Sequence, residues 1–191
     1  MIGYTGGLDP WKIDVDLLVG IARARRDWSI ALAGYVWFGF DASRLEAEPN
    51  IQVLGPQDYV AFPGILKGFD VGLLPFPYNE ITRNGDALKA YEYLAAGLPV
   101  VGRDVPVMRR LLPGVRIAED VEGFVDAIES ALAEPEREAA ERAALAARHS
   151  WDVRTAAKLA LVRGAMARNG GGLEDAGSEP APSADGMERA A

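Results

Sequence analysis

Two charged side chains and a run of backbone amides in the stretch NGDALKAYEYLAAGLPVVG, residues 84–102, have the types and spacing for ligand chemistry. Lys89 and Glu92 are three positions apart and share one face of a helix predicted over residues 87–96. Glu92 could accept hydrogen bonds from a ribose diol, or the two residues could form an exposed ion pair worth less than about 1 kcal/mol. With Asp86 as the predicted N-cap, the amides of residues 84–88 would lie at the positive end of the helix dipole, where a diphosphate can bind.

A glycine pair near the start of the chain is a second candidate for phosphate binding. Gly6 and Gly7 follow a strand predicted over residues 2–5 and precede a helix predicted over residues 15–26. Glycines let the backbone approach a phosphate closely, but GGLDPWK lacks the third glycine of the dinucleotide fingerprint, and a plain tight turn also explains the pair. Lys12 could reach a phosphate as a point charge or be a solvated surface lysine.

Short apolar strands and helical stretches alternate along the chain and would position these residues. Five further strands are predicted within residues 28–34, 50–55, 70–76, 98–102 and 114–119, with helices over 59–67, 121–133, 136–150 and 151–166. Residues 78–86 are predicted to be a polar loop. Gly97 is predicted to cap the carboxyl end of the helix over residues 87–96. Strands without a polar face indicate an α/β fold with a doubly wound parallel sheet. Ligands bind outside the carboxyl ends of such strands, where Gly6, Gly55 and the polar loop would lie.

Composition sets limits on the organisation and partners of the chain. The 191 residues suffice for one good core, predicted to span residues 1–168, whereas residues 169–191 predict a disordered acidic tail. A net charge of −8 argues against broad nucleic-acid binding. The lack of cysteine excludes disulfides and thiolate chemistry and is compatible with a cytoplasmic location. We see no signal peptide and no apolar run near the roughly 20 residues of a membrane helix.

The segment ALKAYEYLAAGLPVV, residues 87–101, resembles the donor-site helix and following strand of GT-B retaining glycosyltransferases of the group 1, or family 4, type. The family pattern is lysine-x-x-glutamate-tyrosine-leucine-alanine-x-glycine-x-proline-valine-valine. Three further segments, GYTGGLDPWKIDVDLL, IQVLGPQDYVAFPGILKGFDVGLLPF and HSWDVRTAAKL, extend the resemblance over residues 2–167. It implies a Rossmann-like domain, one half of a GT-B fold, that binds a nucleotide-diphosphate sugar as donor substrate without a cofactor or metal.

The resemblance also implies roles for individual residues. Gly6 and Gly7 would lie beside the distal phosphate and sugar, Lys12 would pair with the diphosphate, and Glu92 would bind the ribose. Residues 85–88 would present amides to the phosphates, and residues 55–57 would lie near the base. Two positions depart from the family: Asn84 replaces the first glutamate of the E-x7-E motif, and Gly7 replaces a frequent arginine. The candidate donor-binding residues are Gly6, Gly7, Lys12, Gly55, Asn84, Gly85, Leu88, Lys89 and Glu92.

Enzymes of the resembled class have a preceding domain that holds the acceptor and often a catalytic histidine. The only histidine here, His149, is predicted to end a polar helix, so no catalytic residue is assigned. The chain could be a donor-binding domain completed by a separate acceptor domain or partner chain, a sugar-nucleotide-binding module without turnover, or a domain whose glycines and charges are only turns and surface. Any peripheral membrane association would come through the missing domain.

The sequence does not decide what covers two groups of apolar side chains. Trp11, Trp37 and Phe38 could line a cleft or fill a core. The helix over residues 151–166 is predicted to expose an apolar stripe that needs a partner, because in the resembled family the closing helix crosses to the other domain. The stripe consists of Ala157, Leu161, Val162 and Ala165.

Overall fold

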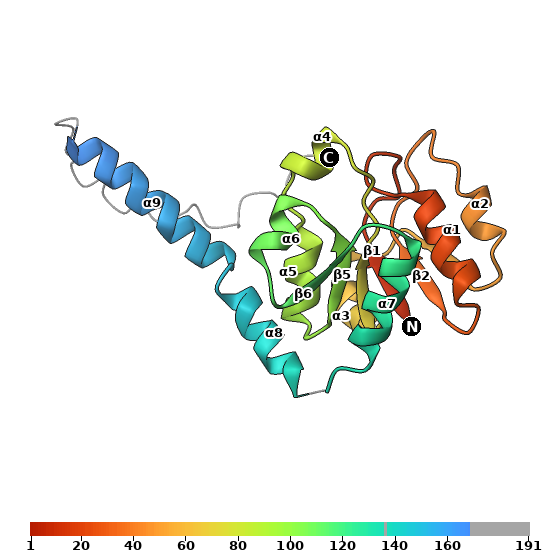
Figure 1. Cartoon of the computed structure of the whole chain (residues 1–191). Helices are drawn as coiled ribbons and strands as arrows, with labels where there is room; N and C mark the ends of the chain where they lie inside the picture. Colours follow the sequence, from red (N-terminus) through yellow and green to blue (C-terminus); the bar gives the residue numbers. More distant parts are fainter. Residues whose placement is uncertain (136, 169–191) are drawn as a thin grey trace, which may run out of the picture. The chain divides into compact units, whose positions relative to one another are not determined.

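The computed structural model describes residues 1–135 and 137–168, and its centre is a six-stranded sheet (Figure 1). All strand pairs are parallel, and the order is β3-β2-β1-β4-β5-β6. The strands are β1 (Ile2–Thr5), β2 (Ile30–Ala33), β3 (Ile51–Gly55), β4 (Val71–Leu74), β5 (Val100–Arg103) and β6 (Val115–Ala118). The order reverses direction between β1 and β4, so the predicted doubly wound parallel sheet is confirmed.

The connections between the strands are mostly helical. The helices are α1 (Val15–Ala24), α2 (Ser43–Glu46), α3 (Phe62–Lys67) after a 3-10 turn η1 (Tyr59–Ala61), α4 (Glu80–Asn84), α5 (Leu88–Ala95), α6 (Pro106–Arg110), α7 (Val121–Leu132), α8 (Glu138–Ala147) and α9 (Trp151–Arg168). The predicted long helices are all present within a few residues. After the C-cap of α5, Gly97 takes the left-handed conformation, with φ of +80°, that makes glycine a helix terminator.

The polar loop predicted over residues 78–86 is wrong in part, because its centre forms α4. The Asn79 side chain accepts a hydrogen bond from the Thr82 amide at 2.9 Å, and the Asn79 amide donates to the Thr82 hydroxyl at 3.2 Å. This reciprocal capping box satisfies two of the amide donors at the start of the helix. One turn of helix is too short to show a 3.6-residue period, so the cap was its only signal in the sequence.

Each face of the sheet packs on its own apolar cluster. Helices α1 and α7 lie on one face (Figure 1). They bury residues such as Leu18, Ile21 and Phe124 against alternate strand residues. On the other face α3 and α5 contribute Leu66 and Leu94. This alternation of side chains between the faces is the two-residue period of a strand.

On the face of the sheet that α5 covers, two strand glycines leave space for aromatic rings. A Cβ atom on Gly3 would lie 2.0 Å from the ring of Phe69, and one on Gly72 would lie 2.4 Å from the ring of Tyr93. Real side chains do not approach so closely, so the two central strands need glycine at these positions to accept the aromatic rings. Gly72 therefore determines where Tyr93 of α5 can lie.

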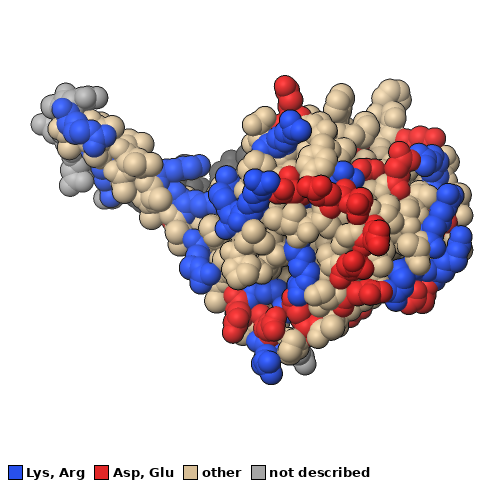
Figure 2. Space-filling model, in the orientation of Figure 1, with Lys and Arg blue, Asp and Glu red and all other residues tan. Residues whose placement is uncertain are grey.

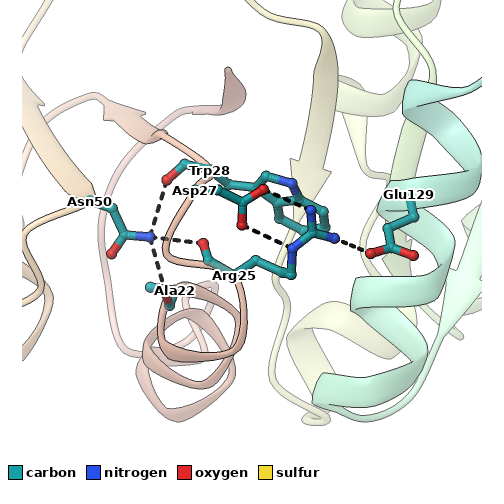
Figure 3. Close-up of polar contacts among 6 residues, drawn as sticks. All are labelled: Ala22, Arg25, Asp27, Trp28, Asn50 and Glu129. Carbon is teal, nitrogen blue, oxygen red and sulfur yellow. Dashed lines mark hydrogen bonds and ion pairs between the residues drawn. The ribbon is translucent and has the colours of Figure 1, made fainter.

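Polar contacts fix the carboxyl end of α1 (Figure 3). The Asn50 side-chain amide donates at 3.0, 3.1 and 3.1 Å to the carbonyl oxygens of Ala22, Arg25 and Trp28. The Arg25 guanidinium stacks 4.2 Å from the centre of the Trp28 ring and pairs with Glu129 of α7. Because the last carbonyls of a helix lack partners within it, these contacts complete α1 and join it to its neighbour.

The chain forms two compact units, Met1–Ser150 and a second unit that begins at Trp151. Helix α9, in the second unit, buries none of its residues, and Leu161 and Val162 of the predicted apolar stripe are both exposed. The predicted acidic tail, residues 169–191, lies outside the described residues, and the domain boundary at residue 168 stays a prediction. Among the described residues, no helix has both the length and the apolarity needed to cross a membrane.

Candidate functional site

A cavity of about 280 Å³ lies at the carboxyl edge of the sheet, where the strand order reverses. Its walls come from the segment after β1, the segment after β4 and the start of α5. Six of the nine candidate residues line it: Gly6, Gly7, Lys12, Gly85, Leu88 and Lys89. Gly55, Asn84 and Glu92 do not. The topology thus brings together candidate residues as far apart in the sequence as Gly6 and Lys89.

The glycine pair forms one wall of the cavity and leaves no room for side chains. Gly6 has a φ of +144°, and a Cβ atom there would lie 2.9 Å from the Tyr4 hydroxyl. A Cβ atom on Gly7 would lie 2.6 Å from Nε1 of Trp37. The Tyr4 hydroxyl also donates to the carbonyl oxygen of Gly7 at 3.1 Å. The loop is therefore a closely packed turn whose bare backbone faces the cavity.

Each of the two lysines at the cavity is paired with a carboxylate. Lys12 Nζ lies 3.3 Å from Oδ2 of Asp9, and Lys89 Nζ lies 2.9 Å from Oε2 of Glu92. The exposed ion pair considered for Lys89 and Glu92 is formed, with Lys89 on the cavity and Glu92 outside it. The Lys89 side chain also reaches the glycine loop, because a Cβ atom on Gly6 would lie 3.5 Å from the Cε atom of Lys89. The side chains of Lys89 and Glu92 are 30% and 39% exposed, so a phosphate could replace Glu92 beside Lys89 at little cost, whereas the buried Asp9 still needs its partners.

Asp9 is a site residue that sequence reasoning missed. Only 8% of its side chain is exposed, and it accepts a hydrogen bond from the Trp11 amide at 2.9 Å as well as pairing with Lys12. A buried carboxylate needs such partners, and they fix Lys12 at the cavity wall. The signal available in the sequence was the Asp-Pro step at residues 9 and 10, which favours the start of a turn.

The structure corrects the predicted N-cap of α5 and shows that two of the backbone amides predicted for the phosphates have partners within the protein. Ala87, not Asp86, is the N-cap of α5, and its side chain makes no capping hydrogen bond. The Gly85 amide donates to the Ile81 carbonyl at 2.7 Å, and the Leu88 amide donates to the Asp86 carbonyl at 2.9 Å. Both amides have acceptors within the protein, because α4 ends directly before α5 and the turn between the two helices is hydrogen-bonded. Asp86 lines the cavity instead, with its carboxylate 3.9 Å from Arg110.

Long-range hydrogen bonds join the segments around the cavity. The Asn79 side chain donates to the Trp11 carbonyl at 2.7 Å, which ties α4 to the segment after β1. Arg103, at the end of β5, pairs at 2.6 Å with Asp14, the N-cap of α1, whose amide donates to the Pro75 carbonyl after β4 at 2.8 Å. The walls are thus preorganised by contacts between residues as many as 89 positions apart.

The remaining candidates lie elsewhere. Trp11, Trp37 and Phe38 are 60%, 55% and 101% exposed, so they do not fill the core. His149 follows the C-cap of α8, as predicted, and its ring centre lies 5.3 Å from that of Tyr91. It is not among the cavity-lining residues.

A larger cavity, of about 590 Å³, lies at the amino end of β6, away from the carboxyl edge of the sheet. Leu112 and Gly114, directly before β6, form part of its wall together with α8. Its Glu134 pairs with both Arg116 and Arg142. Because these charged groups satisfy one another, and because ligands of doubly wound sheets bind at the carboxyl edge, the smaller cavity is the candidate site.

A doubly wound sheet with a glycine loop at its reversal point is an arrangement in which α/β domains bind ligands. The model of the family "Glycosyl transferases group 1" matches residues 1–134, and the chain belongs to this family. Its fold is the Rossmann-like fold of the GT-B glycosyltransferases.

Relatives of known name agree with this family. The putative teichuronic acid biosynthesis glycosyltransferase TuaH of Bacillus subtilis (strain 168) is 31% identical over 147 residues, which cover 69% of this chain and 34% of TuaH. The chain therefore spans about a third of that relative's length.

Solved structures share the fold at low sequence identity. HepE of Anabaena in complex with UDP and glucose has a TM-score of 0.63 at 20% identity, over 81% of this chain and 45% of HepE. The trehalose 6-phosphate synthase of Burkholderia multivorans has a TM-score of 0.69 at 17% identity, over 88% of this chain and 43% of the synthase.

Proposed function

We propose that this chain is the donor-binding part of a glycosyltransferase and that a nucleotide-diphosphate sugar binds in the 280 Å³ cavity. The observation that carries the proposal is the meeting of Gly6, Gly7, Lys12 and Lys89 at the reversal point of the sheet. The bare glycine backbone admits a phosphate, and the two ammonium groups offset its charge. Family membership supports transfer of a glycosyl group, and HepE, a protein of the same fold, was solved with UDP and with UDP-glucose.

In this proposal, the cavity stabilises the leaving group of the transfer. As the bond from the sugar carbon to the diphosphate oxygen breaks, negative charge increases on the diphosphate, and Lys12 and Lys89 stabilise it. Their carboxylate partners, Asp9 and Glu92, hold the ammonium groups in place before the donor arrives. Glu92, one turn along α5, remains the candidate for the ribose hydroxyls, and the segment from Gly55 the candidate for the base.

A separate domain or partner chain would supply the acceptor. This chain covers 34% of TuaH and 45% of HepE, so more than half of each of these proteins has no counterpart in the alignment. An expected location in the cytoplasm stays a prediction.

Isothermal titration calorimetry with UDP, GDP and ADP at millimolar concentration tests donor binding. We expect one of the three to bind, and Lys12→Ala and Lys89→Ala to weaken binding roughly tenfold to a hundredfold each, because a charge-assisted hydrogen bond is worth about 1.5–3 kcal/mol. Lys67→Ala makes the same charge change at an exposed position of α3, is the matched control and should bind as the parent does. No binding to folded protein, or equal losses in all three variants, would refute the proposal.

A binding module without turnover is the second candidate function. The glycine loop and the two lysines of the cavity would suffice for it. Release of the nucleoside diphosphate from a donor sugar, measured with and without a candidate partner chain, distinguishes the two. Turnover only with the partner supports the enzyme, whereas binding without turnover in both cases supports the module.

A further inference from the structure

The sheet separates at the point where the candidate site begins. Strands β1 and β4 pair only at Ile2 with Val71 and at Gly3 with Gly72. The amides of Ile2 and Gly6 donate toward β2, to the carbonyl oxygens of Ser29 and Ala33. Because successive amides of a strand point to opposite sides, the Thr5 amide points toward β4, where pairing has already ended.

A side-chain hydroxyl takes the place of the missing strand partner. The Tyr93 phenol oxygen accepts the Thr5 amide at 2.7 Å, and the Thr5 hydroxyl lies 3.2 Å from the same oxygen. Tyr93 is 0% exposed, and the absence of a side chain at Gly72 gives its ring the space to reach this point. A buried backbone donor needs a partner, and the phenol satisfies the Thr5 amide at a point where β4 does not pair with β1.

Helix α5 reaches the glycine loop with two side chains. Lys89 and Tyr93 are four residues apart and lie on one face of α5. Lys89 lies against the Cβ position of Gly6 at the cavity, whereas Tyr93 holds Thr5, the residue directly before Gly6, from inside the core. Any shift of α5 therefore moves the ammonium group and the loop together.

We propose that Tyr93 is a positioning residue, which through the Thr5 amide sets the Gly6–Gly7 loop, and through α5 sets Lys89, for the donor phosphates. This role rests on the proposed function, because it presumes that the loop binds a nucleotide diphosphate. Tyr93 does not touch the ligand itself. Tyr4 assists from within β1, where its hydroxyl holds the Gly7 carbonyl oxygen.

Tyr93→Phe tests the proposal, with Tyr91→Phe on the same helix as the matched control. Amide hydrogen exchange followed by NMR should show faster exchange at Thr5 in Tyr93→Phe, with the Tyr4 amide, on the β2 side, unchanged. The UDP dissociation constant should rise about tenfold, the effect of one lost hydrogen bond, while Tyr91→Phe keeps the parent value. Thr5→Val, which keeps the backbone amide and removes only the hydroxyl, should stay within about threefold of the parent.

The outcomes distinguish this proposal from the one on which it rests. Unchanged Thr5 exchange, or parent-like UDP affinity with fast Thr5 exchange, overturns the positioning role. A parent protein that binds no nucleotide overturns the proposed function, and the Thr5 exchange rate then decides alone whether Tyr93 fixes the loop. Where Tyr93→Phe does not fold, 3,5-difluorotyrosine at position 93 weakens the phenol acceptor in a folded protein, provided that the pH is low enough to keep the fluorinated phenol protonated. The Thr5 amide proton should then move to higher field, and an unmoved resonance refutes the contact.

Discussion

At the scale of single residues, Glu92 can act in two ways that the structure makes separable. It pairs with Lys89 at 2.9 Å and does not line the cavity, so it can act through the lysine or contact a ribose beyond the cavity rim. A direct contact depends on the hydroxyl of the ligand, whereas an effect through Lys89 depends on the phosphates. The nucleotide itself can therefore serve as the second variant of a double-mutant cycle.

We predict that Glu92→Gln weakens UDP binding roughly tenfold to a hundredfold, because a charge-assisted hydrogen bond to the ribose is lost. The 2′-deoxy nucleotide should bind the parent protein more weakly and should lose much less on the substitution. Calorimetric titration of both nucleotides against both proteins measures the coupling. Equal losses for the two nucleotides would mean that Glu92 acts through Lys89 or the fold.

The two buried tyrosines behind the glycine loop predict a loss of stability in alkali. Burial raises the pKa of Tyr93, and burial followed by the charges of Tyr93 and Asp9 raises the pKa of Tyr4, both above the usual value of about 10. Above pH 10 the unfolded chain loses these protons while the folded protein keeps them, so the free energy of unfolding falls as pH rises. Each tyrosine contributes a slope of about 1.4 kcal/mol per pH unit between pH 10 and its raised pKa.

Urea unfolding of the parent and Tyr93→Phe between pH 9 and pH 11.5 measures this slope. Tyr93→Phe should show a slope shallower by about 1.4 kcal/mol per pH unit above pH 10 and no difference in slope below it. Tyr4→Phe should behave in the same way. Parallel curves for parent and variants over the whole range would show that neither phenol is held neutral by the fold.

At the scale of elements, the glycine loop is held between neighbouring strand ends as well as from the core. The Gly6 amide donates to Ala33, the last residue of β2, and a Cβ atom on Gly34 would lie 1.7 Å from the Gly6 carbonyl oxygen. The Gly34 amide in turn donates to Gly55 at the end of β3. Gly55 therefore supports the candidate site through the sheet edge without lining the cavity.

We predict that Gly34→Ala pushes the loop away from β2, because backbone cannot yield as a side-chain end can. The free energy of unfolding should fall by about 1–3 kcal/mol, and UDP affinity should fall with it. Gly64→Ala is the control: no atom lies within 4 Å of its Cβ position in α3, so it should be neutral or stabilise by up to about 1 kcal/mol. Urea unfolding and UDP titration of both variants decide. Parent-like behaviour of Gly34→Ala would show that the loop is not confined.

Elements with a local signal were predictable from the sequence, and contacts across the sheet were not. The six strands and the helices α1 and α7 each have several apolar residues at a fixed period. Helix α4 has one turn and no period, and its misassignment as loop led to the wrong account of the Gly85 and Leu88 amides. The bond between Tyr93 and Thr5 spans 88 positions and follows from strand order and from Gly72, neither of which has a local signature.

At the scale of the whole molecule, charge and length bear on partners. On the face shown in Figure 2, acidic side chains lie in several groups with basic side chains between them, and no broad basic surface forms there. The expectation that the chain binds no nucleic acid stays a prediction. The positive groups that matter for the proposed donor are local ones, Lys12 and Lys89, in a chain of net charge −8. A phosphate site needs only such local charge.

The first unit should be stable without the second. Both apolar clusters lie within residues 2–146, and every residue that lines the candidate site precedes residue 90. Helix α9 buries none of its residues, so it adds no core of its own. We therefore predict that the free energy of unfolding of a chain ending at Ser150 differs from that of the full chain by no more than about 0.5 kcal/mol, the usual size of a change outside a core. The shortened chain should bind UDP with the same affinity. Urea unfolding with hydrogen exchange across α7 and α8 measures the first quantity, and calorimetry the second. A loss above about 2 kcal/mol would mean that α9 completes the fold of this unit, and a selective loss of UDP affinity would mean that it contributes to the site.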